Sequence, residues 1–140
     1  MIIYADTCGE WLVSALACYK NNYTIVTLYT NLGPEGVTYG IQQVEAKLVI
    51  TAQALTTQLL ETLKTFDNQV RHVVYIQDPL RQQLDVDDSA AARVSTFSSV
   101  EELGKSVEWS QDEAITKDDI GMIMYTSGST GQPKGVHISI

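Results

Sequence analysis

Short apolar segments recur along the first half of the chain, and each is followed by a segment with helical spacing. The apolar segments are rich in β-branched and aromatic residues and lie at residues 2–4, 24–29, 48–50 and 72–76. Helical spacing follows Pro34, which suits a first helical position, and recurs in the stripe of Leu55, Leu59, Leu63 and Phe66. Strands that alternate with single helices every 22–25 residues or so are typical of βαβ units. The sequence therefore predicts an α/β fold, a doubly wound and mostly parallel sheet with flanking helices.

The first helix is predicted at residues 9–20. Thr7 and Glu10 have the spacing of a capping box before it. Asn21 and Asn22 can adopt the left-handed conformation that ends helices. Because the helical segment is apolar nearly all round, we expect it to be buried on several sides.

The regular alternation is lost between residues 80 and 117. Residues 94–97 are expected to form a short strand, and Ser98 with Glu101 offers a capping box for a short helix that Gly104 ends. Ten of the 17 acidic residues lie between residues 85 and 119, so this part of the chain is strongly acidic. A solvated, variable connection is the favoured interpretation, and a specific acidic docking site is the alternative.

Composition and charge exclude several classes of protein. Apolar residues make up 44% of the 140 residues, which predicts a globular chain rather than a disordered one. The net charge of −8 argues against a surface for nucleic acid or anionic membrane, since both require basic patches. No apolar run approaches the ~20 residues that span a membrane, and no basic leader precedes an apolar signal region. The chain itself is therefore expected to be soluble and intracellular.

The cysteines and histidines give no sign of a metal or thiol site. Cys18 lies in the apolar helical segment and is interpreted as a small buried hydrophobic residue. Cys8 lies in a predicted turn without an activating base beside it, so neither catalysis nor a disulfide is expected. His72 and His137 are far apart and have no neighbouring ligand set, so no metal site is expected from them.

The strongest candidate site follows an apolar strand predicted at residues 120–125. Glycines allow backbone N–H groups to converge on an anion, and neighbouring hydroxyl groups can donate to phosphate oxygens. Pro133 stiffens the segment before a mobile positive charge on a lysine. The candidate binding residues are Thr126, Ser127, Gly128, Ser129, Thr130, Gly131 and Lys134. A flexible Gly/Ser turn is the alternative interpretation.

The order of these residues differs from that of the common nucleotide P-loop. That motif requires Gly-Lys followed by Ser or Thr, whereas here Gln132 and Pro133 follow Gly131, and Gly135 follows Lys134. The run Thr-Ser-Gly-Ser-Thr-Gly-x-Pro-Lys-Gly resembles instead the phosphate loop of the adenylate-forming superfamily. This superfamily includes acyl-CoA synthetases, luciferases and the adenylation domains of peptide synthetases.

The first half of the chain resembles one branch of that superfamily, the eukaryotic long-chain fatty acyl-CoA synthetases. The resemblance is carried by residues 2–7, 10–11, 17–20, 26–29, 32–33, 36–37 and 40, and it extends to residues 98–104. Cys8 and Gly9 depart from it, because the family usually has Arg-Ala after Thr7. The chain also departs after Val136, so no family role is assigned to His137.

The resemblance implies a division of the chain and a fold. Residues 1–79 would be the βαβ core of the AMP-binding N-terminal domain, and residues 80–117 an acidic irregular connection. Residues 118–140 would be the strand with its phosphate-binding loop, truncated. The whole would be a partial doubly wound βαβ subdomain of the adenylate-forming N-terminal domain, an internal piece of a longer enzyme.

The resemblance also implies a reaction for the parent enzyme. A long-chain fatty acid would attack ATP to give acyl-adenylate and pyrophosphate, and coenzyme A would then form the thioester. ATP and Mg²⁺ would be the cofactors and CoA the co-substrate. The site residues would bind rather than catalyse, and the 140-residue chain alone is expected to be inactive. The parent is expected at the endoplasmic reticulum or another organelle membrane, held by segments outside this sequence.

Two other hypotheses remain open. The chain could be a non-catalytic truncated or interaction fragment, whose exposed sheet edges would invite pairing. Alternatively, the parent could be an adenylate-forming enzyme for another carboxylic acid, such as an aryl or amino acid.

Overall fold

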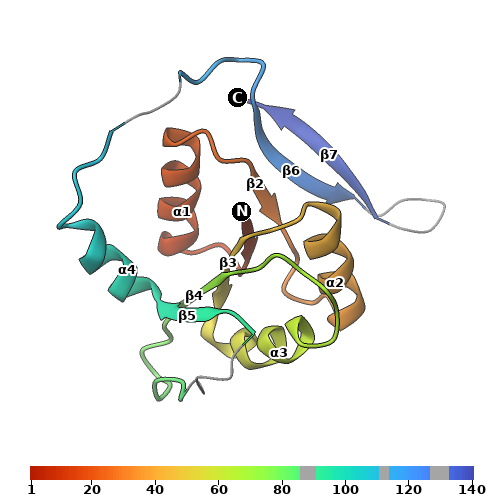
Figure 1. Ribbon diagram of the computed structural model, residues 1–140, viewed down its shortest axis with the longest axis vertical. Coiled ribbons are helices and arrows are strands. Elements are labelled where there is room, and N and C mark those ends of the chain that lie inside the picture. Colours follow the sequence, from red (N-terminus) through yellow and green to blue (C-terminus); the bar gives the residue numbers. More distant parts are fainter. Residues whose placement is uncertain (86–90, 111–113, 127–132) are drawn as a thin grey trace.

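The computed structural model describes residues 1–85, 91–110, 114–126 and 133–140, and their strands form one sheet (Figure 1). The sheet has seven strands in the order β5-β4-β3-β1-β2-β6-β7. The strands are β1 (Ile2–Tyr4), β2 (Ile25–Thr27), β3 (Leu48–Ala52), β4 (His72–Ile76), β5 (Arg93–Thr96), β6 (Ile120–Thr126) and β7 (Lys134–Ser139). The helices are α1 (Gly9–Lys20), α2 (Pro34–Gln43), α3 (Gln53–Leu63) and α4 (Phe97–Gly104).

The pairing of the strands confirms the predicted α/β fold. Every neighbouring pair from β5 to β6 is parallel, and β6 with β7 is the antiparallel pair at the edge. Strand β6 joins the sheet beside β2, not beside the strand that precedes it in sequence. All predicted strands are present, whereas β7 was not predicted.

Helices cover both faces of the sheet, as Figure 1 shows for α1 on one side and for α2 and α3 on the other. Successive strand residues point to opposite faces, so Ile2 joins the core beneath α2 and α3 while Ile3 packs against α1. The core beneath α2 and α3 is the larger of the two and includes Val49, Leu59 and Val73. The βαβ pattern of the sequence thus places two hydrophobic layers around one sheet.

Helix α1 is less buried than its composition predicts. Its buried residues are Ser14, Ala15 and Cys18, whereas Leu12, Val13 and Leu16 are at least half exposed. The expectation of burial on several sides is wrong for the described residues, because α1 packs on the sheet along one face alone. No helix in the described ranges is long and apolar enough to cross a membrane.

The start of α1 differs from the predicted cap, whereas its end agrees with the prediction. The N-cap residue is Cys8, and no side chain caps the helix there, so the capping box of Thr7 and Glu10 is wrong. The predicted end is confirmed, because Asn22 has a φ of 54°, in the left-handed region. The spacing of a capping box occurs here without its geometry.

Cys18 is buried beside Ile3 and Ile25, which confirms its interpretation as a small hydrophobic residue. Burial raises the pKa of its thiol to about 11, because the thiolate would lose its hydration, and the nearby amino group of Met1 opposes that shift. Both Cys8 and Cys18 are free thiols. The thiol of Cys18 is therefore protonated at neutral pH and unsuited to nucleophilic chemistry.

Helix α4 begins two residues earlier than its predicted capping box requires. Its N-cap is Thr96, whose hydroxyl accepts a hydrogen bond from the Ser99 amide at 3.0 Å. Ser98 lies inside the helix, where its hydroxyl donates to Gln77. The prediction of Ser98 as the cap is therefore wrong, although the helix itself and its end at Gly104 are confirmed.

Replacement of Thr96 by alanine is expected to destabilise α4 by about 1 kcal/mol, because the Ser99 amide loses its acceptor. Hydrogen exchange of the Ser99 amide measures the effect locally. Thr57→Ala, the same substitution at an exposed threonine of α3, is the matched control and should leave that amide unchanged. Equal acceleration in both variants would contradict the assignment of Thr96 as the cap.

Candidate functional site

The candidate site lies at the carboxyl edge of the parallel strands. Strands β2 and β6 run side by side, with Thr27 opposite Met124, and Thr126 ends β6 beyond this pair. In open α/β sheets ligands bind beyond the carboxyl ends of the strands. The end of β6 at Thr126 is therefore one of the places where such a sheet can bind a ligand.

Two predicted site residues, Thr126 and Lys134, are described, and the structure brings them together. They are opposite each other in the antiparallel pair of β6 and β7, and the Thr126 hydroxyl donates to the Lys134 carbonyl oxygen at 3.4 Å. Both residues are exposed to solvent. The remaining predicted residues, Ser127, Gly128, Ser129, Thr130 and Gly131, lie outside the described residues.

Strand β7 explains how Lys134 reaches this position. The chain returns antiparallel along β6, with Gly135 opposite Tyr125 and His137 opposite Ile123. The sequence carried a signal for this strand, because Val136 and Ile138 alternate with smaller or polar residues. The strand pairing places Lys134 opposite Thr126 at the end of the sheet.

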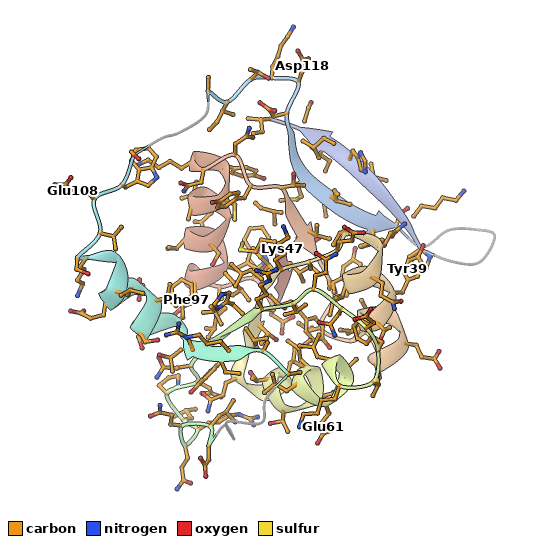
Figure 2. All side chains as sticks on the ribbon, viewed as in Figure 1. Tyr39, Lys47, Glu61, Phe97, Glu108 and Asp118 are labelled. Carbon is orange, nitrogen blue, oxygen red and sulfur yellow. The ribbon has the colours of Figure 1, made fainter. Side chains whose placement is uncertain are left out.

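Helix α2 contacts β6 and the residue directly before β7 through residues that the sequence analysis missed. The Tyr39 hydroxyl donates to the Pro133 carbonyl oxygen at 3.3 Å, and the Tyr125 hydroxyl donates to Gln43 Oε1 at 2.7 Å. The rings of Tyr39 and Tyr125 meet edge to face, with centroids 6.3 Å apart. Figure 2 shows Tyr39 on α2 beside the end of the β6–β7 hairpin.

An apolar cavity of about 170 Å³ lies between α2 and the ends of β2 and β6. Gly40 brings α2 close to β2, since a Cβ there would be 2.7 Å from a methyl carbon of Leu28. The cavity is lined by Thr27, Leu28, Tyr29, Leu32, Gly36, Tyr39, Gly40, Tyr125, Thr126 and Pro133. Its lining is almost entirely apolar, which disfavours a phosphate group inside the cavity.

A second hollow, of about 370 Å³, lies at the ends of β1 and β2. Asp6 and Thr30 line it, and the Thr30 hydroxyl donates to Asp6 Oδ1 at 2.8 Å. Trp11 and Met124 complete part of its wall. Across the residues that the structure describes, no three His, Cys, Asp or Glu side chains are grouped to hold a metal ion.

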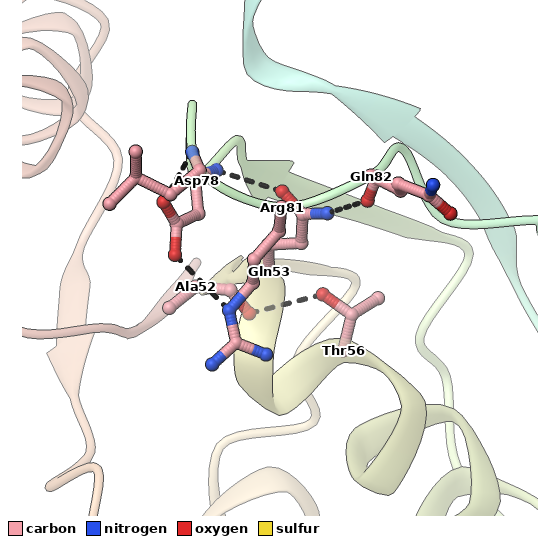
Figure 3. Close-up of polar contacts among 7 residues, drawn as sticks. Ala52, Gln53, Thr56, Asp78, Arg81 and Gln82 are labelled. Atoms are coloured by element: carbon pink, nitrogen blue, oxygen red, sulfur yellow. Dashed lines mark hydrogen bonds and ion pairs between the residues drawn. The ribbon is translucent and has the colours of Figure 1, made fainter.

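The loop after β4 is held at the same edge by a buried glutamine (Figure 3). Gln53, which is 5% exposed, accepts a hydrogen bond from the Asp78 amide at 2.8 Å and donates to the Gln82 carbonyl oxygen at 2.5 Å. Asp78 also pairs with Arg81 at 3.1 Å. The end of β4 is therefore fixed to the start of α3 by polar contacts.

A protein-family model described as "AMP-binding enzyme" matches residues 1–140, the whole chain. The chain belongs to the AMP-binding enzyme family. Among curated relatives, "Long chain acyl-CoA synthetase 8" of Arabidopsis thaliana is 31% identical over 139 residues. "Long-chain-fatty-acid--CoA ligase 2" of Schizosaccharomyces pombe is 34% identical over 139 residues. The alignments cover 98% and 97% of this chain but 19% and 20% of those relatives, so the chain spans about a fifth of their length.

Solved structures of adenylate-forming enzymes share this fold. The A-PCP didomain of carboxylic acid reductase from Segniliparus rugosus, in complex with AMP, superposes with a TM-score of 0.79 at 20% identity. An acyl-CoA synthetase from Brucella canis superposes with a TM-score of 0.71 at 21% identity. Each covers 99% of this chain, while the chain covers 21% and 22% of them. The described sheet is thus part of the N-terminal fold of AMP-binding enzymes.

Proposed function

We propose that this AMP-binding family chain supplies the triphosphate-binding segment of a long-chain fatty acid–CoA ligase. The binding residues would be Thr126, Ser127, Gly128, Ser129, Thr130, Gly131 and Lys134. The parent would convert a fatty acid, ATP and CoA into acyl-CoA, AMP and pyrophosphate through an acyl-adenylate. The observation that carries the proposal is the pairing of Thr126 with Lys134 at the carboxyl edge of the sheet.

The chemistry of the first step favours residues of this kind. A fatty-acid carboxylate that attacks ATP brings one anion toward a polyanion, so the developing charge and the leaving pyrophosphate must be stabilised. The Lys134 ammonium group can approach the triphosphate as a mobile point charge, and the Thr126 hydroxyl can donate to a phosphate oxygen. A carboxylate nucleophile needs no general base, and we assign none.

The donor set of the described residues fits a nucleotide triphosphate better than a free metal ion. Mg²⁺ is commonly bound by one or two carboxylates together with the substrate's own phosphates. Bound with ATP, Mg²⁺ would neutralise part of the phosphate charge. Thr126 and Lys134 would orient the phosphates, and CoA would enter as the co-substrate of the parent.

The proposal also states which carboxylic acid the parent enzyme activates and where in the cell it acts. The names of the curated relatives support a long-chain fatty acid over aryl or amino acids. The parent would act at the endoplasmic reticulum or another organelle membrane through other segments. Residues 1–79, 80–117 and 118–140 would be the βαβ core, the acidic connection and the phosphate-binding strand and loop. The alternative is that the chain acts as a non-catalytic interaction fragment.

Titration of the purified chain with MgATP, paired with an assay for acyl-CoA synthesis, tests the proposal. The chain is expected to bind MgATP weakly and to form no thioester. Gly128→Ala should weaken binding about tenfold, because a side chain at this glycine would limit how closely the backbone approaches phosphate. Gly104→Ala is the matched control, since a Cβ there would meet no other atom within 4 Å. A folded chain that binds no MgATP, or Gly128→Ala binding as the control does, would contradict the proposal.

A further inference from the structure

Helix α2 presents two polar side chains toward the strands that flank the candidate phosphate site. Tyr39 and Gln43 are four residues apart, so they lie on one face of the helix. Tyr39 reaches Pro133, just before Lys134, and Gln43 reaches Tyr125, just before Thr126. One helix face thus contacts the chain immediately before each of the two described site residues.

The contact at Tyr125 is part-buried and directional. Tyr125 is 7% exposed, and its hydroxyl finds its acceptor in Gln43 Oε1 at 2.7 Å. A buried hydroxyl without a partner is costly, so the hydrogen bond selects one position for the end of β6. Burial, and then the neighbouring Tyr39, raise the pKa of Tyr125, which keeps this hydroxyl protonated as a donor at neutral pH.

The contact at Pro133 fixes the start of β7. Proline has no N–H to donate, so its carbonyl oxygen is the backbone group through which a neighbour can hold it. The Tyr39 hydroxyl donates to that oxygen at 3.3 Å, while the Tyr39 ring packs edge-on against Tyr125. Tyr39 therefore contacts Tyr125 of β6 and the residue that directly precedes β7.

Helix α2 is itself held firmly enough to serve as a reference for these contacts. Val37 and Ile41 are buried in the main core, and Gly40 allows α2 to lie against Leu28 of the segment after β2. The position of α2 is therefore set by apolar packing in the main core, to which Tyr125 of β6 also belongs. The hydrogen bonds of Tyr39 and Gln43 then hold Pro133 and Tyr125 against α2, and with them the start of β7 and the end of β6.

We propose that Tyr39 and Gln43 are positioning residues that hold the two strand ends at the separation a bound triphosphate requires. This inference rests on the proposed function, because it deepens the role of the same site. Neither residue is assigned a contact with ATP. Both would act by keeping Thr126 and Lys134 in place before binding, which lowers the entropy lost when the ligand binds.

The test compares Tyr39→Phe and Gln43→Leu in the whole chain by two measurements. The first is the dissociation constant for MgATP, which each variant should raise about fivefold, as expected for one lost hydrogen bond. The second is hydrogen exchange of the Thr126 and Lys134 amides without ligand, which should become several-fold faster. Exchange of the β1 and β3 amides should stay unchanged, because the core is not altered.

Two matched controls separate positioning from a general change of surface. Gln42→Leu makes the same substitution one residue away, at an exposed position beside a different hollow. Tyr23→Phe removes a hydroxyl group from a tyrosine that is mostly exposed. Both controls should match the wild type in both measurements. In a Tyr125→Phe background, Gln43→Leu should have no further effect, since the two residues share one hydrogen bond.

The outcomes distinguish this inference from the proposed function. If the wild-type chain binds MgATP and the variants bind equally well, the positioning role is overturned while the proposed function stands. If the wild-type chain binds no MgATP, the proposed function fails, and amide exchange alone decides whether α2 holds the strand ends. Exchange rates equal to those of the controls would overturn the inference in either case.

Discussion

Replacement of Lys134 by alanine is expected to weaken MgATP binding by about 30-fold, because charge-assisted contacts to phosphate are among the strongest polar interactions. The side chain is exposed at the start of β7, so its removal should leave the fold intact. Isothermal titration at low ionic strength measures the loss. The difference from the wild type should shrink as salt is added, since salt screens an exposed charge.

The control for this variant removes a lysine from the other edge of the sheet. Lys47 is exposed and directly precedes β3, so it lies at the amino end of the strands, away from Thr126. Lys47→Ala makes the net charge more negative by the same one unit and should change MgATP affinity less than twofold. Equal losses in the two variants would assign the effect to overall charge and remove Lys134 from the site.

Truncation of Leu59 to alanine is expected to have the largest effect on stability, a loss of about 3 kcal/mol in the free energy of unfolding. Leu59 is 1% exposed on α3 and packs in the core beneath β1, β3 and β4. The loss combines the transfer of apolar surface with the cavity left behind. Urea unfolding followed by circular dichroism measures it.

Leu16→Ala is the control, because it makes the same truncation in a helix at a side chain that is 58% exposed. Its expected effect is within about 0.5 kcal/mol of the wild type. A comparable loss at both positions would mean that the exposed face of α1 is covered in solution, for example by a second copy of the chain.

The elements that the sequence predicted well are those fixed by local hydrophobic periodicity. Helix α1 and strand β4 have the bounds that their apolar patterns predict. The alternation of strands with single helices also predicted the parallel sheet, because this pattern is typical of α/β folds. The helix starts were predicted less well. Capping-box spacing occurs at both Thr7 and Ser98, but only the local backbone decides which hydroxyl meets an amide, and at α4 this is Thr96.

In the candidate site, too, some residues could be predicted from the sequence and others could not. The motif of residues 126–134 is local, so its candidate residues could be named from the sequence, and the structure places Thr126 and Lys134 together. The supporting contacts of Tyr39 and Gln43 could not be foreseen. They join residues 94 and 82 positions apart, and nothing in a polar helix face indicates which distant strand it will meet.

The position of β6 has a consequence for the order in which the molecule forms. Strand β6 pairs with β2, and the Thr24 hydroxyl reaches the Ile120 carbonyl oxygen across 96 positions of sequence. The β1–β4 core is made from contacts much closer in the chain, and such contacts form sooner because less chain entropy is lost in closing them. During synthesis the core therefore leaves the ribosome with one side of β2 unpaired, and the strand that carries the candidate site fills that edge last. A defect in β6 would thus act after the β1–β4 core has folded. It would leave β2 as an open edge on which chains can associate.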